Sequence, residues 1–208
     1  MSLLQAGFGS SGDDYTIDDS LRFRSSATAY LSRTPASASN RKTYTFSAWI
    51  KLSDTQGRVF GADPNNTGTP VAIFSIGNGY IASAQIYTVG SYNLTWESTS
   101  FYRDPAAWYH VMFVVDTTQA SSANAVKIYV NGSQTTLTFT AHTGSYSQNM
   151  DTEINNTGAH LIGLINASSQ KFDGYMAEIN FIDGQALTPS DFGEFDDNGT
   201  WKPLEYTG

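Results

Sequence analysis

Apolar and polar residues alternate along most of the chain in runs of about 5–10 residues, which is the pattern of half-buried β-strands. Clusters of Gly, Asn, Asp, Ser and Pro bound these runs and favour turns between them. The clearest run is residues 42–52, with Tyr44, Phe46, Ala48, Ile50 and Leu52 on one face and Thr45, Ser47, Trp49 and Lys51 on the other. Roughly a dozen such strands with no helices between them predict a sandwich or jelly roll.

The run at residues 108–115 is apolar on both faces, which is typical of a central strand between two layers. One side carries Tyr109, Val111, Phe113 and Val115, and we expect these residues to pack against Phe46 and Ile50 across the sandwich. Trp49 and Trp108 are assigned to the core in this interpretation.

Three local patterns predict specific connections. Residues 19–33 have the pattern of a short hairpin, and residues 126–139 form a clearer one, with its turn at Asn131-Gly132. Residues 188–195 predict a short helix, with Thr188 as the N-cap and Pro189 at the first helical position.

The 208 residues suit one β domain, and the two ends differ from the middle. We divide the chain into an N-terminal arm at residues 1–19, a sandwich at residues 20–195 and an extended C-terminal tail at residues 196–208. Apolar rings such as Trp201 and Tyr206 are costly to leave in water, so the tail must lie on something. We expect the tail to dock on its own domain and the arm to contact a neighbouring chain.

Composition excludes several classes of function. Only 11 basic residues are spread along a chain of net charge −8, so binding to nucleic acid is not expected. The absence of cysteine excludes disulfides, zinc-thiolate sites and thiol catalysis, and favours assembly in a reducing cytoplasm. The N-terminal residues lack the basic and apolar regions of a signal peptide, and no stretch approaches the length of a membrane span.

Four motifs, YTFSAWIKL, DPAAWYHVMFVVDTT, KIYVNGSQ and FDGYMAEINFIDGQALTPSDF, follow one another in the order of a known family. Over roughly residues 20–192 the chain resembles laminin-G-like, concanavalin A-like lectin/glucanase domains. The resemblance implies a jelly-roll β-sandwich of two antiparallel sheets, with one short C-terminal helix. The flanking segments resemble tail-fibre and other virion proteins of marine bacteriophages, which implies a virion component made in the host cytoplasm.

Glu178, Asn180 and Asp183 stand at the spacing E-x-N-x-x-D, which resembles the E-x-D-x-x-E of the catalytic strand in laminarinase-type glucanases. Retaining glycosidases need two carboxyl groups about 5 Å apart, and only a bulge would bring Asp183 to the face of Glu178. Asn180 replaces the central carboxylate, and Asp183-Gly184 is typical of a turn. We therefore expect no catalytic residues.

Two loops offer the oxygen ligands that calcium prefers. Asp63, Asn65 and Asn66 lie in one loop, and Asp151 and Glu153 lie in another. Pentraxins and plant lectins of the resembling superfamily use loops of this sort, although Asp and Asn are ordinary turn residues as well. Calcium is therefore a candidate cofactor that the protein does not require.

Aromatic and polar side chains alternate between residues 78 and 103, as lectin sites require for stacking on a sugar and bonding its hydroxyl groups. Half of these rings must fill the core, so the group rather than any one member predicts a site. The candidate sugar-binding residues are Tyr80, Tyr87, Tyr92, Asn93, Trp96, Tyr102 and Arg103.

The three histidines lack metal-ligand spacing, and His110 is interpreted as a hydrogen-bonded structural residue. The sequence therefore favours a non-enzymatic, homo-oligomeric virion domain on a tail fibre or capsid, with weak affinity for a host-surface glycan. Two alternatives stay open: an architectural module that contacts other virion proteins without binding sugar, and a glycan-degrading depolymerase.

Overall fold

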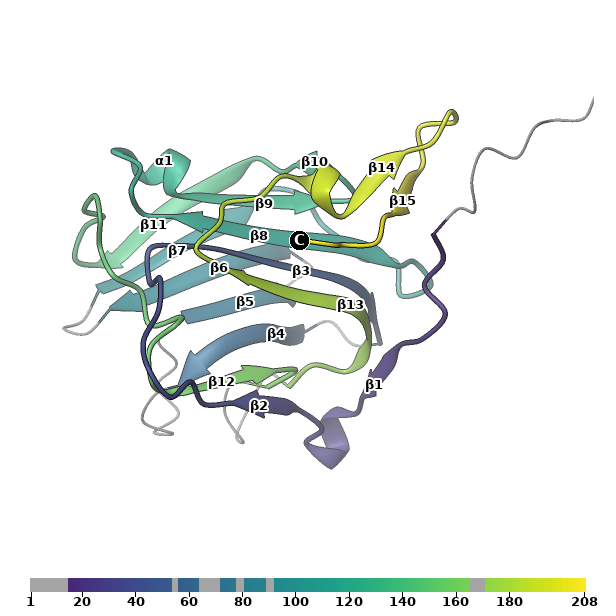
Figure 1. Cartoon of the computed structure of the whole chain (residues 1–208), viewed down its shortest axis with the longest axis horizontal. Coiled ribbons are helices and arrows are strands. Elements are labelled where there is room, and N and C mark those ends of the chain that lie inside the picture. Colours follow the sequence, from purple (N-terminus) through teal and green to yellow (C-terminus); the bar gives the residue numbers. More distant parts are fainter. Residues whose placement is uncertain (1–14, 54–55, 64–71, 78–80, 89–91, 165–170) are drawn as a thin grey trace, which may run out of the picture.

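Two antiparallel sheets face each other in the computed structural model of the chain (Figure 1), which describes residues 15–53, 56–63, 72–77, 81–88, 92–164 and 171–208. Among these residues, the six-stranded sheet has the order β1 (Leu21–Phe23), β13 (Gly174–Asp183), β3 (Thr43–Leu52), β8 (Tyr109–Asp116), β9 (Val126–Val130) and β10 (Ser133–Gln134). The seven-stranded sheet has the order β11 (Leu137–Thr143), β7 (Tyr92–Ser98), β6 (Ile81–Thr88), β5 (Ala72–Gly77), β4 (Gln56–Asp63), β12 (Ala159–Ile162) and β2 (Leu31–Arg33). The predicted all-β jelly-roll sandwich is confirmed.

Aromatic rings from both sheets meet in the core. Phe46 of β3 stacks on Phe60 of β4 at 5.0 Å between ring centroids, and Phe113 of β8 stacks on Phe74 of β5 at 4.6 Å. All four residues are at most 4% exposed. These contacts join the two layers, as the alternating pattern of β3 requires.

The prediction that β8 packs against Phe46 and Ile50 across the sandwich is wrong. Phe46 pairs with Phe113, and Ile50 pairs with Tyr109, as neighbours within the six-stranded sheet rather than across the sandwich. The residues that face Phe46 and Phe113 across the core come from β4 and β5. Alternation predicts the face of a residue correctly but does not tell which strand lies beside it.

One predicted hairpin is confirmed in part and the other is wrong. The left-handed turn at Asn131 (φ 48°) and Gly132 (φ 75°) joins β9 to β10 as predicted, but β10 has only two residues, and residues 137–139 belong to β11 of the other sheet. The predicted hairpin at residues 19–33 is wrong, because β1 pairs with β13 in one sheet and β2 pairs with β12 in the other. Between them, the 3-10 helix η1 (Ser25–Ala27) and left-handed Thr28 carry the chain from one sheet to the other.

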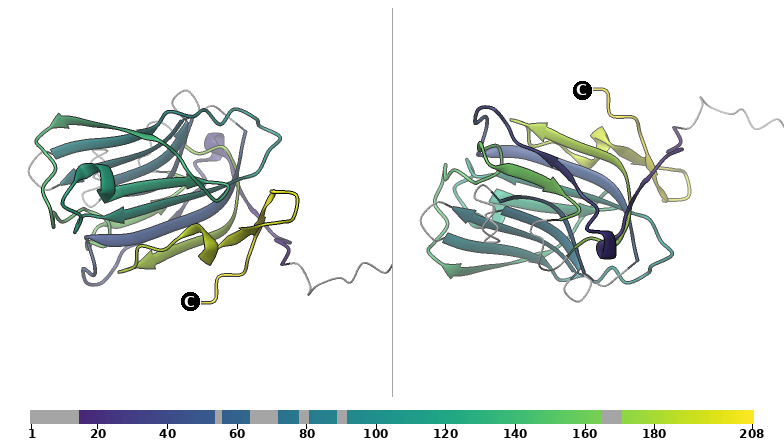
Figure 2. Two further views of the ribbon diagram at one scale, coloured as in Figure 1. Left: turned by 90° about the horizontal axis from the view of Figure 1, so that it is seen from above. Right: turned by 90° about the horizontal axis from the view of Figure 1, so that it is seen from below.

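The C-terminal segment, residues 188–208, covers the outward face of the six-stranded sheet, as Figures 1 and 2 show. The predicted helix at residues 188–195 is shorter, the 3-10 helix η2 (Pro189–Asp191), in which the Asp191 carboxylate accepts from the N–H of Thr188. The predicted extended tail contains β15 (Trp201–Pro203), which pairs with β14 (Gly193–Phe195) at the end of the segment predicted as a helix. The expectation that the tail docks on its own domain is confirmed.

Apolar residues on the outward face of β8 explain why this cover is needed. Met112 and Val114 point away from the main core and are at most 4% exposed. They are buried with Ile182 and Phe192, and Phe192 stacks on Tyr206 at 4.9 Å. A small second core therefore lies between the six-stranded sheet and the C-terminal segment. None of the helices that the structure describes, including the four-residue α1 (Ser122–Ala125), could span a membrane.

Candidate functional site: an aromatic pocket between the two ends of the chain

Trp49 and Trp108 lie on the outward face of the six-stranded sheet, and their assignment to the core is wrong. Ala48 and Ile50 point into the main core, so Trp49 between them points outward. Trp108 precedes β8 and is 36% exposed. Two indole rings on the surface of a sheet, beyond the residues that the C-terminal segment buries, are the first sign of a binding site.

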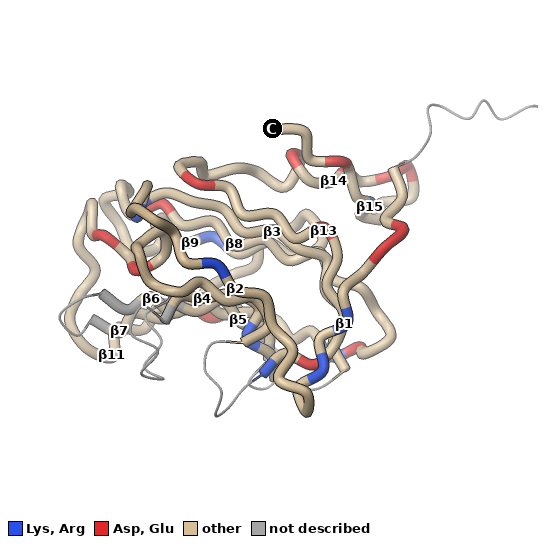
Figure 3. Tube along the Cα trace, turned by 60° about the horizontal axis from the view of Figure 1, so that its bottom comes forward, with Lys and Arg blue, Asp and Glu red and all other residues tan. Residues whose placement is uncertain are grey.

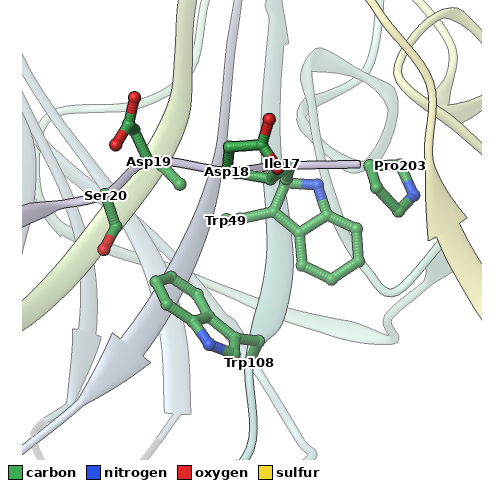
Figure 4. Close-up of a pocket in the computed structure, with 8 residues that line it drawn as sticks. Ile17, Asp18, Asp19, Ser20, Trp49, Trp108 and Pro203 are labelled. Carbon is green, nitrogen blue, oxygen red and sulfur yellow. The ribbon is translucent and has the colours of Figure 1, made fainter. Parts of the chain in front are cut away.

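The two tryptophans line a pocket of about 380 Å³, which is within the size range of small-molecule sites. Its other lining residues come from segments far apart in the sequence: Ile17, Asp18, Asp19, Ser20, Ala177 and Pro203. Figure 4 shows the two indole rings on one side of the segment that carries residues 17–20. The sheet thus supplies the apolar surface, and the two ends of the chain supply the walls.

Strand register explains how the floor of the pocket is assembled. Ala177 of β13 pairs with Trp49 of β3, and Trp49 pairs with His110 of β8. The small side chain of Ala177 leaves room beside the indole of Trp49. On the other side, the C-terminal segment covers His110, which is 1% exposed.

A further exposed ring lies beside the pocket. Tyr175 of β13 is 38% exposed, and its ring centroid is 6.5 Å from that of Trp108. The guanidinium of Arg22 lies 4.9 Å from the ring of Tyr175 and is held by an ion pair of 2.6 Å with Asp173. The aromatic surface therefore extends from the pocket towards β1.

His110 fastens the C-terminal wall of the pocket. The indole N–H of Trp201 donates to His110 Nδ1 at 3.1 Å, and His110 Nε2 lies 2.8 Å from the hydroxyl of Ser47. Because an indole N–H can only donate, Nδ1 is unprotonated and Nε2 carries the proton of the neutral ring. Burial lowers the pKa of His110 to about 4, which keeps the ring neutral. His110 has the predicted structural role.

The indole of Trp201 packs so closely against Gly132 and Gly193 that neither position has room for a side chain. A Cβ at Gly132 would lie 2.3 Å from the indole of Trp201, and one at Gly193 would lie 2.5 Å from it. Gly132 thus allows both the left-handed turn of the β9–β10 hairpin and the close approach of Trp201. Because Pro203 follows Trp201 by two residues in β15, this packing positions the C-terminal wall of the pocket.

The structure does not gather the predicted sugar-binding residues into one site. Tyr80 lies outside the described residues, and Tyr87 and Tyr92 are placed only as members of β6 and β7. Trp96 is a core residue, and its selection as a sugar ligand was wrong: it is 1% exposed, and its indole donates to the carbonyl of Ser122 at 2.9 Å.

The remaining candidates of this group do not face one common site. Asn93 is half-buried in β7, and its buried side-chain oxygen has no hydrogen-bond partner among the described residues. The ring of Tyr102 packs against Tyr109 at 5.7 Å, and the guanidinium of Arg103 lies 4.3 Å from the ring of Phe101. The exposed ring of Phe101 does not line the aromatic pocket.

The predicted calcium ligands lie in different environments. Asp63 ends β4, and Asn65 and Asn66 lie outside the described residues. Asp151 is exposed, 4.0 Å from Lys42. Glu153 is 1% exposed, with one carboxylate oxygen 3.3 Å from Arg41 and the other accepting from Asn156 at 2.6 Å.

Arg41 and Asn156 thus contact the Glu153 carboxylate, although its Oε1 accepts no hydrogen bond from the described residues. In the part of the chain that the structure describes, no group of three or more His, Cys, Asp or Glu side chains could hold a metal ion. Calcium binding stays a prediction.

The strand that resembles a catalytic strand contains the bulge that such a strand would need, between Ala177 and Asn180. Glu178 lies in this bulge with left-handed backbone (φ 46°). Its carboxylate accepts a hydrogen bond from Tyr15, which is the main reason that the pKa of Tyr15 rises to about 12. Asp183 instead accepts from the Asn155 amide at 2.8 Å and the Asn40 N–H at 3.2 Å. The two carboxylates thus hold different segments of the chain.

Comparisons with known proteins agree with this architecture. The family model of the concanavalin A-like lectin/glucanases superfamily matches residues 25–191. Domains LG4-5 of the mouse laminin alpha1 chain superpose with a TM-score of 0.57 at 12% identity, covering 96% of this chain and 48% of that chain. The Ruminococcus gnavus IT-sialidase CBM40 bound to alpha2,6 sialyllactose gives 0.52 at 11% identity, covering 77% of this chain and 95% of that chain. No curated protein matches the chain significantly.

Proposed function

Because the chain belongs to the concanavalin A-like lectin/glucanases superfamily, we propose that it is a non-enzymatic carbohydrate-binding domain. Its site is the pocket of Trp49 and Trp108. The observation that carries this proposal is one pocket lined by two indole rings, the half-buried Trp49 and the exposed Trp108, with polar groups at its rim. An indole stacks on the apolar C–H face of a sugar, while rim oxygens bond its hydroxyl groups. The sialyllactose complex of the similar sialidase module supports testing sugars first.

The arrangement has room for more than one sugar unit. A first ring would enter between Trp49 and Trp108, with Ser20 and the carboxylates of Asp18 and Asp19 available to its hydroxyl groups. A second ring would lie on Tyr175, whose centroid is 6.5 Å from that of Trp108. An oligosaccharide should therefore bind more tightly than its monosaccharide unit.

A glycan array tests this function directly. The wild-type protein should bind a defined set of glycans, and Trp108→Ala should weaken that binding at least tenfold, or about 1.4 kcal/mol. Tyr30→Ala is the matched control, because Tyr30 is 48% exposed and is not among the residues that line the pocket. Equal binding by the wild-type protein and Trp108→Ala would move the site elsewhere, and binding to no glycan would reject the function. Repeating the array with EDTA tests the predicted calcium ion.

Hydrolysis of sugars needs a separate test, because glycosidases use two carboxyl groups. Glu178 and Asp19 both line a larger cavity of about 630 Å³ beside β13. Glu178 interacts with Tyr15, and Asn180 supplies no third carboxylate. We expect no release of reducing ends from laminarin, agar or carrageenan. Release that disappears in Glu178→Gln would favour the depolymerase.

A virion location is part of the proposal and rests on the resemblance of the flanking segments to phage virion proteins. In this proposal the domain is displayed on a tail fibre or capsid as a homo-oligomer. Arm residues 17–19 line the pocket of their own domain, so the predicted contact with a neighbouring chain falls on residues outside the described part of the chain. Mass spectrometry of purified particles would locate the protein. If it is present in particles but binds no sugar, the architectural alternative is favoured. If it is absent from particles, the virion role is rejected.

A further inference from the structure

The rim of the aromatic pocket is acidic. Asp18 and Asp19 line it, and both are exposed. Among the residues that the structure describes at this pocket, none is Lys or Arg. Figure 3 shows further Asp and Glu residues along the neighbouring C-terminal hairpin, which carries Glu194, Asp196 and Asp197. A ligand entering the pocket therefore passes through a negative field.

The nearest cations do not reverse this field. Lys202 of β15 is 3.6 Å from Asp196, and Arg22 is ion-paired with Asp173. Lys51 of β3 lies in the row beyond Trp49, beside Tyr175, with which it is paired in the sheet. Each lies next to the pocket and not in its lining. The charge of the pocket itself comes from the two carboxylates of the arm.

Carboxylates accept hydrogen bonds and donate none when ionised. Sugar hydroxyl groups can donate to them, and such charge-assisted bonds are stronger than neutral ones. A sugar that carries a carboxylate or sulfate offers a like charge, which is repelled and which complementary interfaces exclude. The same two side chains thus favour one class of sugar and reject another.

We propose that this pocket selects neutral sugars and rejects anionic ones, with Asp18 and Asp19 as the specificity-determining residues. The inference rests on the proposed function and narrows it. The predicted ligand is a neutral hexopyranose unit, with an apolar face for the indoles and neighbouring hydroxyl groups for the carboxylates. Sialylated, sulfated and uronic sugars are the rejected class.

Matched pairs of glycans test the proposal, such as lactose with sialyllactose and neutral galactans with their sulfated forms. On an array and by calorimetry at low salt, each neutral member should bind at least tenfold more tightly than its anionic partner. The difference should shrink as salt increases, because exposed charges are screened over about 8 Å at physiological ionic strength. A difference caused by shape alone would not change with salt.

Variants separate the two carboxylates from the general charge of the protein. Asp18→Asn and Asp19→Asn, singly and together, should weaken binding of the neutral sugar severalfold and reduce its preference over the anionic partner. Asp197→Asn is the control, because it removes one exposed charge from the same side of the molecule outside the pocket lining. It should reduce the preference for the neutral sugar much less than the Asp18 and Asp19 variants do, because Asp197 does not line the pocket.

The outcomes distinguish this inference from the function on which it rests. Equal or tighter binding of anionic sugars by the wild-type protein would overturn the selectivity and leave the sugar-binding function standing. A preference that Asp197→Asn reduces as much as the arm variants do would overturn the assignment to Asp18 and Asp19. Binding of neither class would reject both the selectivity and the function.

Discussion

The outward faces of the two sheets differ in chemistry. On the seven-stranded sheet, Ser75 and Ser83 alternate with core residues, and their hydroxyls are hydrogen-bonded at 2.7 Å. On the six-stranded sheet, the corresponding positions hold Trp49, His110 and Met112. On the six-stranded sheet these residues share the outward face with the polar Thr45 and Ser47. The outward positions of β6 and β7 instead include the polar Ser83, Gln85 and Thr95, although both sheets share one core.

The difference shows how apolar residues at outward positions should be interpreted. Met112 and Val114 are buried because the C-terminal segment covers them. Trp49 and Trp108 lie where the cover ends, and there the uncovered rings line a pocket. Apolar outward residues thus have two explanations within one sheet, a fixed cover and, in our proposal, a ligand site. The following predictions separate these explanations.

The largest effect is expected inside the core that both sheets share. Val111 is 0% exposed and pairs with Ala48 and Val130, so Val111→Asp would bury an unpaired charge. We expect the free energy of unfolding to fall by at least about 4 kcal/mol, with loss of soluble protein. Thr138→Asp, at an exposed position of β11, should change it by less than about 0.5 kcal/mol. A soluble Val111→Asp variant that unfolds like the wild type would show that β8 is misplaced.

The second prediction concerns pH and the covered part of the outward face. The pKa of His110 is lowered by burial from 6.5 to about 4, so the unfolded chain binds more protons between these values. The free energy of unfolding should therefore decrease as the pH falls from about 6.5 to 4, by about 3 kcal/mol in total.

Urea unfolding at several pH values would measure this slope in the wild type and in His110→Gln. Burial also lowers the pKa of His160, which contributes to the slope of both proteins. The difference between the two curves therefore belongs to His110. Parallel curves would mean that His110 does not hold the C-terminal segment in its neutral form.

The third prediction concerns the contact between Trp201 and His110 that holds the C-terminal segment on the sheet. Trp201→Ala deletes the hydrogen bond to His110 and the ring that packs against Gly132. Because Trp201 is half-buried, we expect a loss of about 2 kcal/mol in unfolding free energy and a lower melting temperature. Phe101→Ala, at a ring that is 57% exposed, is the control and should change stability much less. Equal losses of unfolding free energy in both variants would show that Trp201 does not hold the C-terminal segment on the sheet.

The smallest effect on stability is expected at the uncovered ring. Trp108 is 36% exposed, so Trp108→Ala should cost less than about 1 kcal/mol of unfolding free energy while weakening sugar binding at least tenfold. Thermal melting and the glycan array, run on the same preparation, would compare the two effects. A melting temperature that falls as far as that of Trp201→Ala would identify Trp108 as part of the cover instead.

The sequence predicts the sandwich well because alternation and turn chemistry are local signals. Residues 42–52 and the Asn131-Gly132 turn are sufficient to place β3 and the β9–β10 hairpin. Which strands become neighbours depends on contacts between residues far apart in the chain. For this reason the partner of Phe46 and the path between β1 and β2 were predicted wrongly.

The aromatic pocket that we propose as the site was not predicted, for a related reason. Density of aromatic residues pointed to residues 78–103, where Trp96 is in the core. The pocket combines Trp49 and Trp108 with residues 17–20 and Pro203, which no spacing brings together. One usable signal was present: Trp49 alternates with Thr45, Ser47 and Lys51, so its strand pattern already placed it on the outward face.

The four tryptophans allow the central claim to be measured in one experiment. Each indole N–H gives its own signal in a ¹H–¹⁵N correlation spectrum, and Trp→Phe variants would assign the four. On titration with a neutral oligosaccharide that the array identifies, the signals of Trp49 and Trp108 should shift. Trp96 and Trp201 should stay in place, because their N–H groups are bonded to Ser122 and His110. Shifts confined to Trp96 or Trp201, or shifts of all four alike, would contradict a sugar site in the pocket of Trp49 and Trp108.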